Sequence, residues 1–251
     1  MGAKQKNLIN PNYITIEIRA GAGGEEAGLF ARDLFDLYSN YAQNNNGKIK
    51  IIDYTPSNLD GYKKIIFQIK ASHVWLKLKY EGGVHRVQRR PQTGKGERIH
   101  TSTVSVATLP KYKRTNIRID SSDLDIDFFK SSGPGGQNVN KRQTAVRITH
   151  QPTGLTASSQ GSRSQAKNRA AALDILKSKI TRAQRKKHSL NKKTRRKKQI
   201  RQARRAQKIR TYHFPQNRLT DHRINEKWHN LEDIMSGNLE PVIKKLQKKI
   251  N

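Results

Sequence analysis

A glycine-rich segment from Ser131 to Asn140 holds the residues whose types and spacing best suit chemistry at a backbone. Its sequence is SSGPGGQNVN, with one amide side chain, Gln137, and two cations directly after it, Lys141 and Arg142. Glycine allows φ above zero and proline removes a donor, so regular structure is excluded here. The segment lacks the Gly-Lys-Ser/Thr of a nucleotide-binding P-loop. Two simple interpretations stay open, a phosphate-gripping turn and a nonspecific RNA-contact loop.

No complete hydrolytic site accompanies this loop. Hydrolysis of an ester requires a placed water and a group that stabilises the oxyanion. The sequence offers no convincing Ser/His/Asp set and no paired carboxylates near the loop. We therefore expect any chemistry at the loop to be shared with a partner.

Strand-like alternation flanks the loop on both sides. Leu124, Ile126 and Phe128 alternate before it, and the run 145–148 follows it ahead of a turn at 152–154. We expect the loop to project from a small sheet. Helical spacing begins near Arg163, and the predicted apolar stripe is Ala166, Ala170, Leu173, Leu176 and Ile180.

The charge of the chain points to a polyanionic partner. It has 51 Lys and Arg against 19 Asp and Glu, a formal net charge of +32. Between Phe128 and Thr220 there are 25 Lys or Arg and one acid, Asp174. A solvated face mixes signs, so this exclusion of acids favours nucleic acid. Residues 182–210 hold 15 cations and no acid, which predicts a frayed or disordered helix in isolation that becomes ordered on RNA phosphates.

Composition argues against several other classes of protein. The absence of cysteine excludes disulfides and thiolate metal sites. The eight His are scattered without an HExxH pattern, so we expect no metal and no cofactor. Apolar runs fall short of the ~20 residues of a membrane span, and no signal or transit peptide is evident. We expect a soluble protein acting where it is made, in the cytoplasm, or in an organelle matrix if the host is eukaryotic.

A second glycine cluster lies between a strand and a helix near the start of the chain. Ile14, Ile16 and Ile18 alternate with polar residues, and AGAGGEE then leads into helical spacing from Phe30 to Tyr41. Acids directly after glycines suit the positive end of a helix. Taken alone, this pattern is more typical of an ordinary helix start than of a binding site.

A polar hairpin follows at residues 82–106. The run GGVHRVQRRPQT leads into a glycine-marked loop at 94–97, and RIHTST then enters a strand. The two strand ends and the loop would bring together Gln88, Thr93, His100 and Thr101. Polar groups at a hairpin tip can bind base edges, and an imidazole can stack between bases. An ordinary polar turn is the simpler alternative.

These motifs together resemble one protein family. SSGPGGQNVN, the following TAVRITHQPTGL, and Arg163-Ser164-Gln165 with Asn168 are similar to the catalytic domain of class I peptide-chain release factors, which end translation on the ribosome. The resemblance covers about residues 12–180 and 208–245. It implies an α+β fold with two parts, a codon-reading α/β superdomain closed by the C-terminal segment and a small α+β domain that carries the glycine loop and a long basic helix.

The resemblance implies roles for the loop. Gly135 and Gly136 would allow the Gln137 backbone N–H to donate to the developing oxyanion in the ribosomal peptidyl-transferase centre, while the Gln137 side chain favours water over other nucleophiles. Gln137 could carry an N5-methyl group added by a glutamine methyltransferase. The residues expected to contact rRNA phosphates are Lys141, Arg142, Arg147, Arg163 and Lys167, with Arg195 and Arg196 in the basic run.

The hairpin resembles the codon-reading part of the branch that recognises UAA and UAG. Its Pro91-Gln92-Thr93 matches the Pro-x-Thr tripeptide of that branch. The family implies that Gly23, Glu26 and Thr93 address the uridine and the next purine. His100 would stack on that purine, and Gln88 and Thr101 would contact the third base. Departures from the family are Gln92, Arg90 where valine is usual, and His213 where asparagine is usual.

We expect three segments. Their boundaries lie at a charged hinge near 111–122 and near Lys208, where the chain returns to the codon-reading domain. The segments are a codon-recognition domain at 12–112, a hydrolysis domain with its basic extension at 113–207, and a C-terminal segment at 208–251 that packs back on the first. Because the resemblance begins near Tyr13, we expect the chain to lack the N-terminal helical domain usual in the family. The basic run could replace the affinity of that domain as an rRNA anchor.

The sequence leaves three functions open. The leading hypothesis is a monomeric, ribosome-dependent termination factor whose partners are rRNA of both subunits, the mRNA stop codon and the P-site peptidyl-tRNA. The alternatives are a codon-independent rescue factor for stalled ribosomes and a structural rRNA-binding protein. The Gln88, Pro91, Thr93, His100 and Thr101 set argues against the rescue factor, and the intact Gly-Gly-Gln argues against the structural protein.

Overall fold

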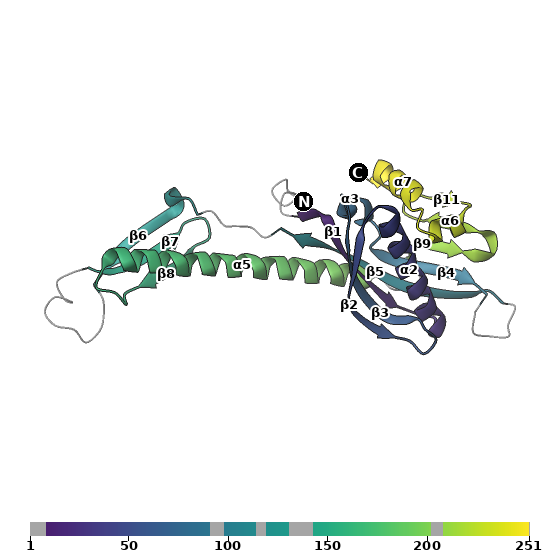
Figure 1. Ribbon diagram of the computed structural model, residues 1–251, viewed down its shortest axis with the longest axis horizontal. Helices are drawn as coiled ribbons and strands as arrows, with labels where there is room; N and C mark the ends of the chain where they lie inside the picture. The colour runs from purple at the N-terminus through teal and green to yellow at the C-terminus, as the bar shows by residue number, and fades with distance from the viewer. Residues whose placement is uncertain (1–8, 91–97, 114–118, 131–142, 202–207, 251) are drawn as a thin grey trace. The chain divides into compact units, whose positions relative to one another are not determined.

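The structure, a computed structural model, describes residues 9–90, 98–113, 119–130, 143–201 and 208–250. The chain divides into two units (Figure 1). The first unit combines Met1–Lys113 with Lys192–Asn251, and the second is the continuous stretch Arg114–Asn191. The first unit is thus assembled from two separated parts of the sequence.

The described part of the first unit forms an eight-stranded sheet. The strands lie in the order β11-β10-β9-β4-β5-β1-β3-β2. Neighbouring strands pair antiparallel except for β4 and β9, which are parallel. The bounds are β1 Ile9–Ala20, β2 Lys48–Pro56, β3 Tyr62–Lys70, β4 Gly83–Arg89, β5 His100–Tyr112, β9 Lys208–His213, β10 Arg218–Asp221 and β11 Glu226–Trp228.

Alternation along β1 decides which face of the sheet becomes the core. Ile14, Ile16 and Ile18 are all 0% exposed, and they pack with the apolar stripe of helix α2, Glu25–Asn44. Side chains of a strand alternate between the two faces, so the residues between these isoleucines lie on the other face. One of them, Glu17, is nevertheless buried. The short helix α3, Val74–Leu78, contributes Val74 and Leu78 to the same core.

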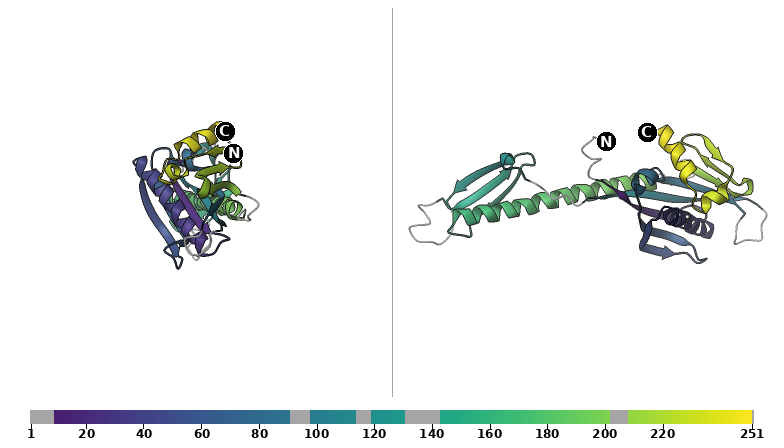
Figure 2. Two further views of the ribbon diagram at one scale, coloured as in Figure 1. Left: turned by 90° about the vertical axis from the view of Figure 1, so that its right-hand side faces the viewer. Right: turned by 45° about the horizontal axis from the view of Figure 1, so that its top comes forward.

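The C-terminal segment completes the first unit. Helices α6, Leu231–Met235, and α7, Glu240–Ile250, add Leu231, Ile234, Val242, Ile243 and Leu246 to the core cluster of α2. Figure 2 shows these helices, in yellow, from two further directions. A 3-10 turn, η3 at Phe214–Gln216, links β9 to β10. The end of the chain thus packs, as two helices, against the core formed by the first part of the sequence.

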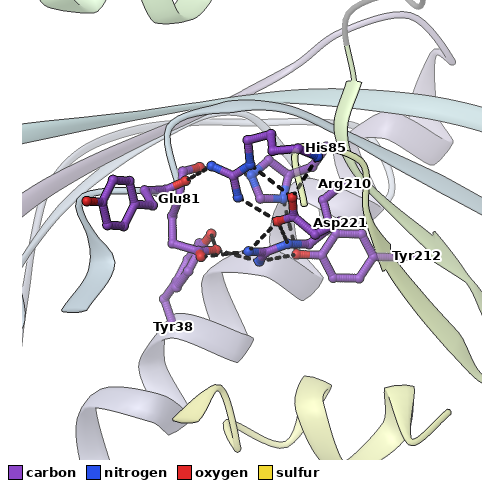
Figure 3. A network of polar contacts seen from close by, with 8 residues as sticks. Tyr38, Glu81, His85, Arg210, Tyr212 and Asp221 are labelled. Carbon is purple, nitrogen blue, oxygen red and sulfur yellow. Dashed lines mark hydrogen bonds and ion pairs between the residues drawn. The ribbon is translucent and has the colours of Figure 1, made fainter. Parts of the chain in front are cut away.

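A buried ionic network joins β9 and β10 to the N-terminal part (Figure 3). Arg210 is fully buried and donates from Nη1 and Nη2 to the two carboxylate oxygens of Glu81, at 2.7 and 2.9 Å. Its Nη2 also lies 3.3 Å from Asp221 Oδ2. Burial, the largest single effect, would raise the pKa of Glu81, but the charge and hydrogen bonds of Arg210, together with the nearby His85 and Arg223, hold that pKa below its usual value. Tyr38 donates its hydroxyl to Glu81 at 3.0 Å.

The second unit is a three-stranded antiparallel sheet, in its described part, packed on a helix. The strands lie in the order β6-β7-β8 and span Leu124–Phe129, Ala145–His150 and Leu155–Ser159, after a 3-10 turn, η1, at Ser121–Asp123. Val146, Ile148 and Ala157 pack on Ala172, Leu176 and Ile180 of α5. Helix α5 runs from Gln165 to Arg201, so its residues up to 191 belong to this unit and those from 192 to the first unit.

The α+β fold with its long basic helix is confirmed, and two details are corrected. Ala166 and Ala170 are exposed, because the buried face of α5 follows positions 168, 172, 176 and 180 instead. The basic run is helical as far as Arg201 rather than frayed, because its last turns, which belong to the first unit, contact Glu17 and Trp75 there. Among the described helices, none is long and apolar enough to cross a membrane.

Candidate functional site

Hydrogen bonds join the segment before the N-terminal tip of α2 to the first residues of β5. Gly21 donates its backbone N–H to Thr103 O at 2.8 Å, and Thr103 donates back to Ala22 O at 2.8 Å. The Thr103 hydroxyl accepts from the Ala22 N–H at 3.1 Å. The glycine cluster therefore continues the sheet before it turns into the helix, which brings the helix tip to the hairpin β4–β5.

Gly23 has no room for a side chain. Its φ is +133°, and a Cβ there would lie 2.2 Å from Ser102 Oγ and 2.5 Å from Ser102 Cβ. Gly24 has φ +57°, yet a Cβ there would have nothing within 4 Å. Only the first of these glycines is thus required by a close approach to β5. Because Gly24 is the N-cap, no side chain caps the first turn of α2.

Glu26 is held at the helix tip by an arginine from β4. The side chain is 5% exposed and accepts from Arg89 Nε, and Arg89 Nη1 also donates to Asp33 at 2.6 Å. Among the described residues, Glu26 Oε2 and Arg89 Nη2 have no hydrogen-bond partner. Burial raises the pKa of the Asp33 carboxyl against the opposing charge of Arg89. The tip thus carries a carboxylate that Arg89 holds in place, and one of its two oxygens has no hydrogen-bond partner in the described part of the chain.

The two predicted hairpin residues Gln88 and Thr101 lie directly opposite each other. They are a cross-strand pair of β4 and β5, so their side chains share a face of the sheet. Arg89 is paired with His100, whose side chain is exposed at the start of β5. His213 of β9 is the partner of Gln88 on its other side. The structure therefore brings Gly23, Glu26, Gln88, His100 and Thr101 to one end of the first unit.

Several predicted residues lie outside the described residues. These are Pro91, Gln92 and Thr93 of the hairpin, and Gly135, Gly136, Gln137, Lys141 and Arg142 of the glycine-rich segment. The residues around the latter are described. Arg163, just before α5, and Lys167, in its first turn, are exposed, and Arg147 is exposed on β7 with its guanidinium 5.3 Å from the Phe129 ring centre.

Arg195 and Arg196 have partners within the first unit. Arg196 Nη2 donates to Glu17 Oε1 at 2.7 Å, and Arg195 lies over the Trp75 ring at 4.9 Å. Gln199 accepts from the Thr108 backbone N–H at 3.0 Å. The last turns of α5 are therefore packed on β1, β5 and α3, and part of their cationic character serves the fold. The nearby Lys193, Lys197 and Lys198 are exposed.

Two contributors to the site were not identified from the sequence. Arg89 has no role in the predicted set, and its partner Glu26 is 63 residues away, so no local pattern connects them. His213 was noticed only as a departure from the family, and its place beside Gln88 depends on the pairing of β4 with β9. Among the described residues, no cluster of three His, Asp or Glu is arranged to hold a metal ion.

Comparison with known proteins gives consistent matches along the chain. A PCRF domain matches residues 5–106 and an RF-1 domain matches residues 113–223. Peptide chain release factor 1 of Endomicrobium trichonymphae is 46% identical over 94% of this chain and 66% of its own length. The protein of the same name from Carboxydothermus hydrogenoformans is 47% identical over 96% of this chain and 69% of its own.

A solved structure matches the fold as well. RF2 of Thermus thermophilus is 32% identical, with a TM-score of 0.56, and the match covers 95% of this chain and 69% of that one. The chain thus spans about two thirds of the length of the relatives it matches.

Proposed function

The chain belongs to the peptide chain release factor family, and from that premise we propose that it recognises UAA and UAG in the ribosomal A site and triggers hydrolysis of the peptidyl-tRNA ester. The observation that carries this proposal is the meeting of Gly23, Glu26, Gln88, His100 and Thr101 at one end of the first unit. Gly23 and Glu26 are more than 60 positions away from the three hairpin residues in the sequence, and each of the five has a polar or backbone group suited to a base.

The geometry of this end supports codon reading by hydrogen bonds. Glu26 Oε2 is a buried acceptor without a partner among the described residues, and the imide N–H of uracil is a donor that could satisfy it. Gln88 and Thr101 lie on one face, where an amide and a hydroxyl can each donate and accept. His100 is exposed and can stack on a base. The match of Pro91-Gln92-Thr93 to the Pro-x-Thr tripeptide of one branch of the family favours UAA and UAG over UGA in this proposal.

Catalysis in this proposal is shared with the ribosome. Gly135 and Gly136 would let the Gln137 backbone N–H reach the oxyanion, and the Gln137 side chain, methylated or not, would select water. Exposed Arg147, Arg163 and Lys167, with Lys141 and Arg142, would bind rRNA phosphates. Arg195 and Arg196 would first have to share or leave their contacts with Trp75 and Glu17, so the exposed lysines beside them are better placed for that contact.

Peptide release from programmed ribosomes tests the proposal. Ribosomes carrying a labelled peptidyl-tRNA are prepared with UAA, UAG, UGA, a sense codon or an empty A site. We expect release on UAA and UAG, little on UGA, and none on the sense codon. Release on the empty A site at the UAA rate would overturn codon reading and favour the rescue alternative. No release on any ribosome would favour a structural rRNA-binding protein.

A matched pair of variants separates reading from folding. Gln88→Ala removes a side chain from the proposed third-base contact, whereas Arg86→Gln changes the next outward-facing position on the same strand, where Arg86 Nε donates to Thr211 at 3.1 Å. We expect the first to weaken release on UAA and UAG while the second leaves codon preference unchanged.

A further inference from the structure

Asn168 is a polar residue on the buried face of α5. It is 1% exposed, and it occupies the position one turn before Ala172, Leu176 and Ile180, which pack on the sheet. Its neighbours Lys167 and Arg169 are exposed. A buried amide is tolerated only when its groups are hydrogen-bonded, because an unsatisfied amide costs about 1–3 kcal/mol.

Every hydrogen-bonding group of the Asn168 side chain has a partner. Nδ2 donates to Thr144 O and to Ser162 O, both at 2.8 Å. Oδ1 accepts from the Ser162 N–H at 3.0 Å and from Ser159 Oγ at 3.4 Å. Two donors and two acceptors are the full capacity of a carboxamide. One side chain thus joins the start of β7, the end of β8 and the turn before α5.

A second amide acts at the same place. Gln165, one turn earlier on α5, donates from Nε2 to the carbonyl of Gln143 at 3.1 Å. Gln143 and Thr144 are the first two described residues after the glycine-rich segment. We call Gln165 and Asn168 the amide clamp, because they hold two successive carbonyls at this point.

Strand pairing does not fix these two residues. The described pairing of β7 begins at Ala145, opposite Phe129 on β6, and Val146 is the first to pair with β8. The backbone at 143 and 144 therefore depends on the clamp for its position. Groups that act in a transition state need placement within about 0.5 Å, and a misplacement of about 1 Å can cost about a hundredfold in rate.

We propose that Asn168, assisted by Gln165, is a positioning residue for peptidyl-tRNA hydrolysis: it fixes the backbone at Thr144, four residues after the end of the glycine-rich segment. This inference rests on the proposed function. The clamp contacts neither substrate nor codon, so it should act on the maximal rate of release and not on ribosome binding.

The test measures release on UAA ribosomes over a range of factor concentrations. Asn168→Ala should lower the maximal rate by about tenfold or more, with the half-saturating concentration changed by less than about threefold. Asn168→Asp, which keeps the acceptor but loses both donors, should behave similarly. The control is Thr149→Val, which removes the hydrogen bond to Thr156 (3.2 Å) near the other end of the same strand pair. It should leave both quantities unchanged.

Outcomes that overturn the proposal are distinct from failure of the proposed function. If Asn168→Ala is folded and releases at the parent rate, or if Thr149→Val lowers the rate equally, Asn168 serves stability alone. Should Asn168→Ala fail to fold, Gln165→Ala decides, because Gln165 is exposed and alanine suits a helix. An unchanged maximal rate in that variant would refute the clamp. Absence of release by the unmodified protein would instead refute the proposed function.

Discussion

Acidification should destabilise the first unit through one buried histidine. The His85 ring is fully buried, with Nε2 2.9 Å from the Glu81 carbonyl and Nδ1 3.1 Å from the Tyr212 hydroxyl. A carbonyl can only accept, so Nε2 carries the proton and Nδ1 accepts from Tyr212. Burial, followed by the charge of Arg210, lowers the pKa of His85 to about 4, against the opposing effect of Glu81 and with a further lowering by Arg223. The ring is neutral when the protein is folded at pH 7.

The size of the effect follows from this pKa. In the unfolded chain His85 has its ordinary value of 6.5, so between pH 6.5 and about 4 the unfolded state binds a proton that the folded state does not. Stability is therefore complete above pH 6.5 and falls as the pH drops towards 4. At about 1.4 kcal/mol per pH unit, the loss approaches about 3 kcal/mol, a large part of the stability of a typical domain.

Urea unfolding of the parent and of His85→Gln, at pH 7.0, 5.5 and 4.5, measures this loss. Glutamine does not titrate, so the difference in unfolding free energy between the two proteins isolates the histidine. The pKa values of Glu81 and Asp221 lie below their ordinary values, so their stabilisation is present above those values and is lost at lower pH in both proteins. We expect the difference to shrink by about 2–3 kcal/mol between pH 7.0 and 4.5. A difference in unfolding free energy that stays the same at all three pH values would refute the assignment of the proton to His85.

Three further predictions concern helix α5 and the N-terminal tip of α2. Arg196→Gln should lower the free energy of unfolding by about 1–2 kcal/mol, because the buried carboxylate of Glu17 would then be paired with Arg19 alone. In urea unfolding, the exposed control Lys197→Gln should change this free energy by less than about 0.5 kcal/mol. Equal losses in the two variants would contradict a stabilising ion pair. Gly23→Ala should reduce release on UAA, because its Cβ would meet Ser102 and its φ of +133° disfavours a side chain; release at the parent rate would remove the steric argument. Four cations of α5 are exposed before its last turns: Arg182, Arg185, Lys186 and Lys187. Their replacement by neutral residues should flatten the dependence of log K for ribosome binding on log salt by up to about 0.7–0.9 per lost phosphate contact, without changing the UAA/UGA release ratio. Ribosome binding measured across a salt series would show an unchanged slope if these residues are only solvated.

Local patterns in the sequence predicted the elements of this protein well. The alternation at Ile14, Ile16 and Ile18 and the glycines before Glu25 gave β1 and the start of α2, because periodicity and capping depend on near neighbours. The hairpin pattern indicated that Gln88 and Thr101 lie near each other, and the structure pairs them across β4 and β5. The roles of these residues in codon reading stay predictions.

Features that depend on distant partners could not be predicted from such patterns. Arg89 is one of several arginines in a basic stretch, and only the fold brings Glu26 to it. The apolar stripe of α5 fades after Ile180, yet the helix continues, because Glu17 and Trp75 are supplied by other elements. Asn168 belongs to a motif visible in the sequence, but its burial and its four hydrogen bonds depend on the packing of α5 against the sheet.

The parallel pairing of β4 with β9 has a consequence for the order in which the protein can fold during its own synthesis. Partners such as Arg86 and Thr211 are 125 residues apart, and the whole second unit is made between them. Until residues 208–213 have been translated, β4 is an edge strand, and the nearby Glu81 and His85 lack the charge of Arg210. Non-local pairing of this kind is slow, and open edges invite pairing with other chains. A nascent chain that stops before Lys208 therefore carries a finished second unit and an unfinished first one.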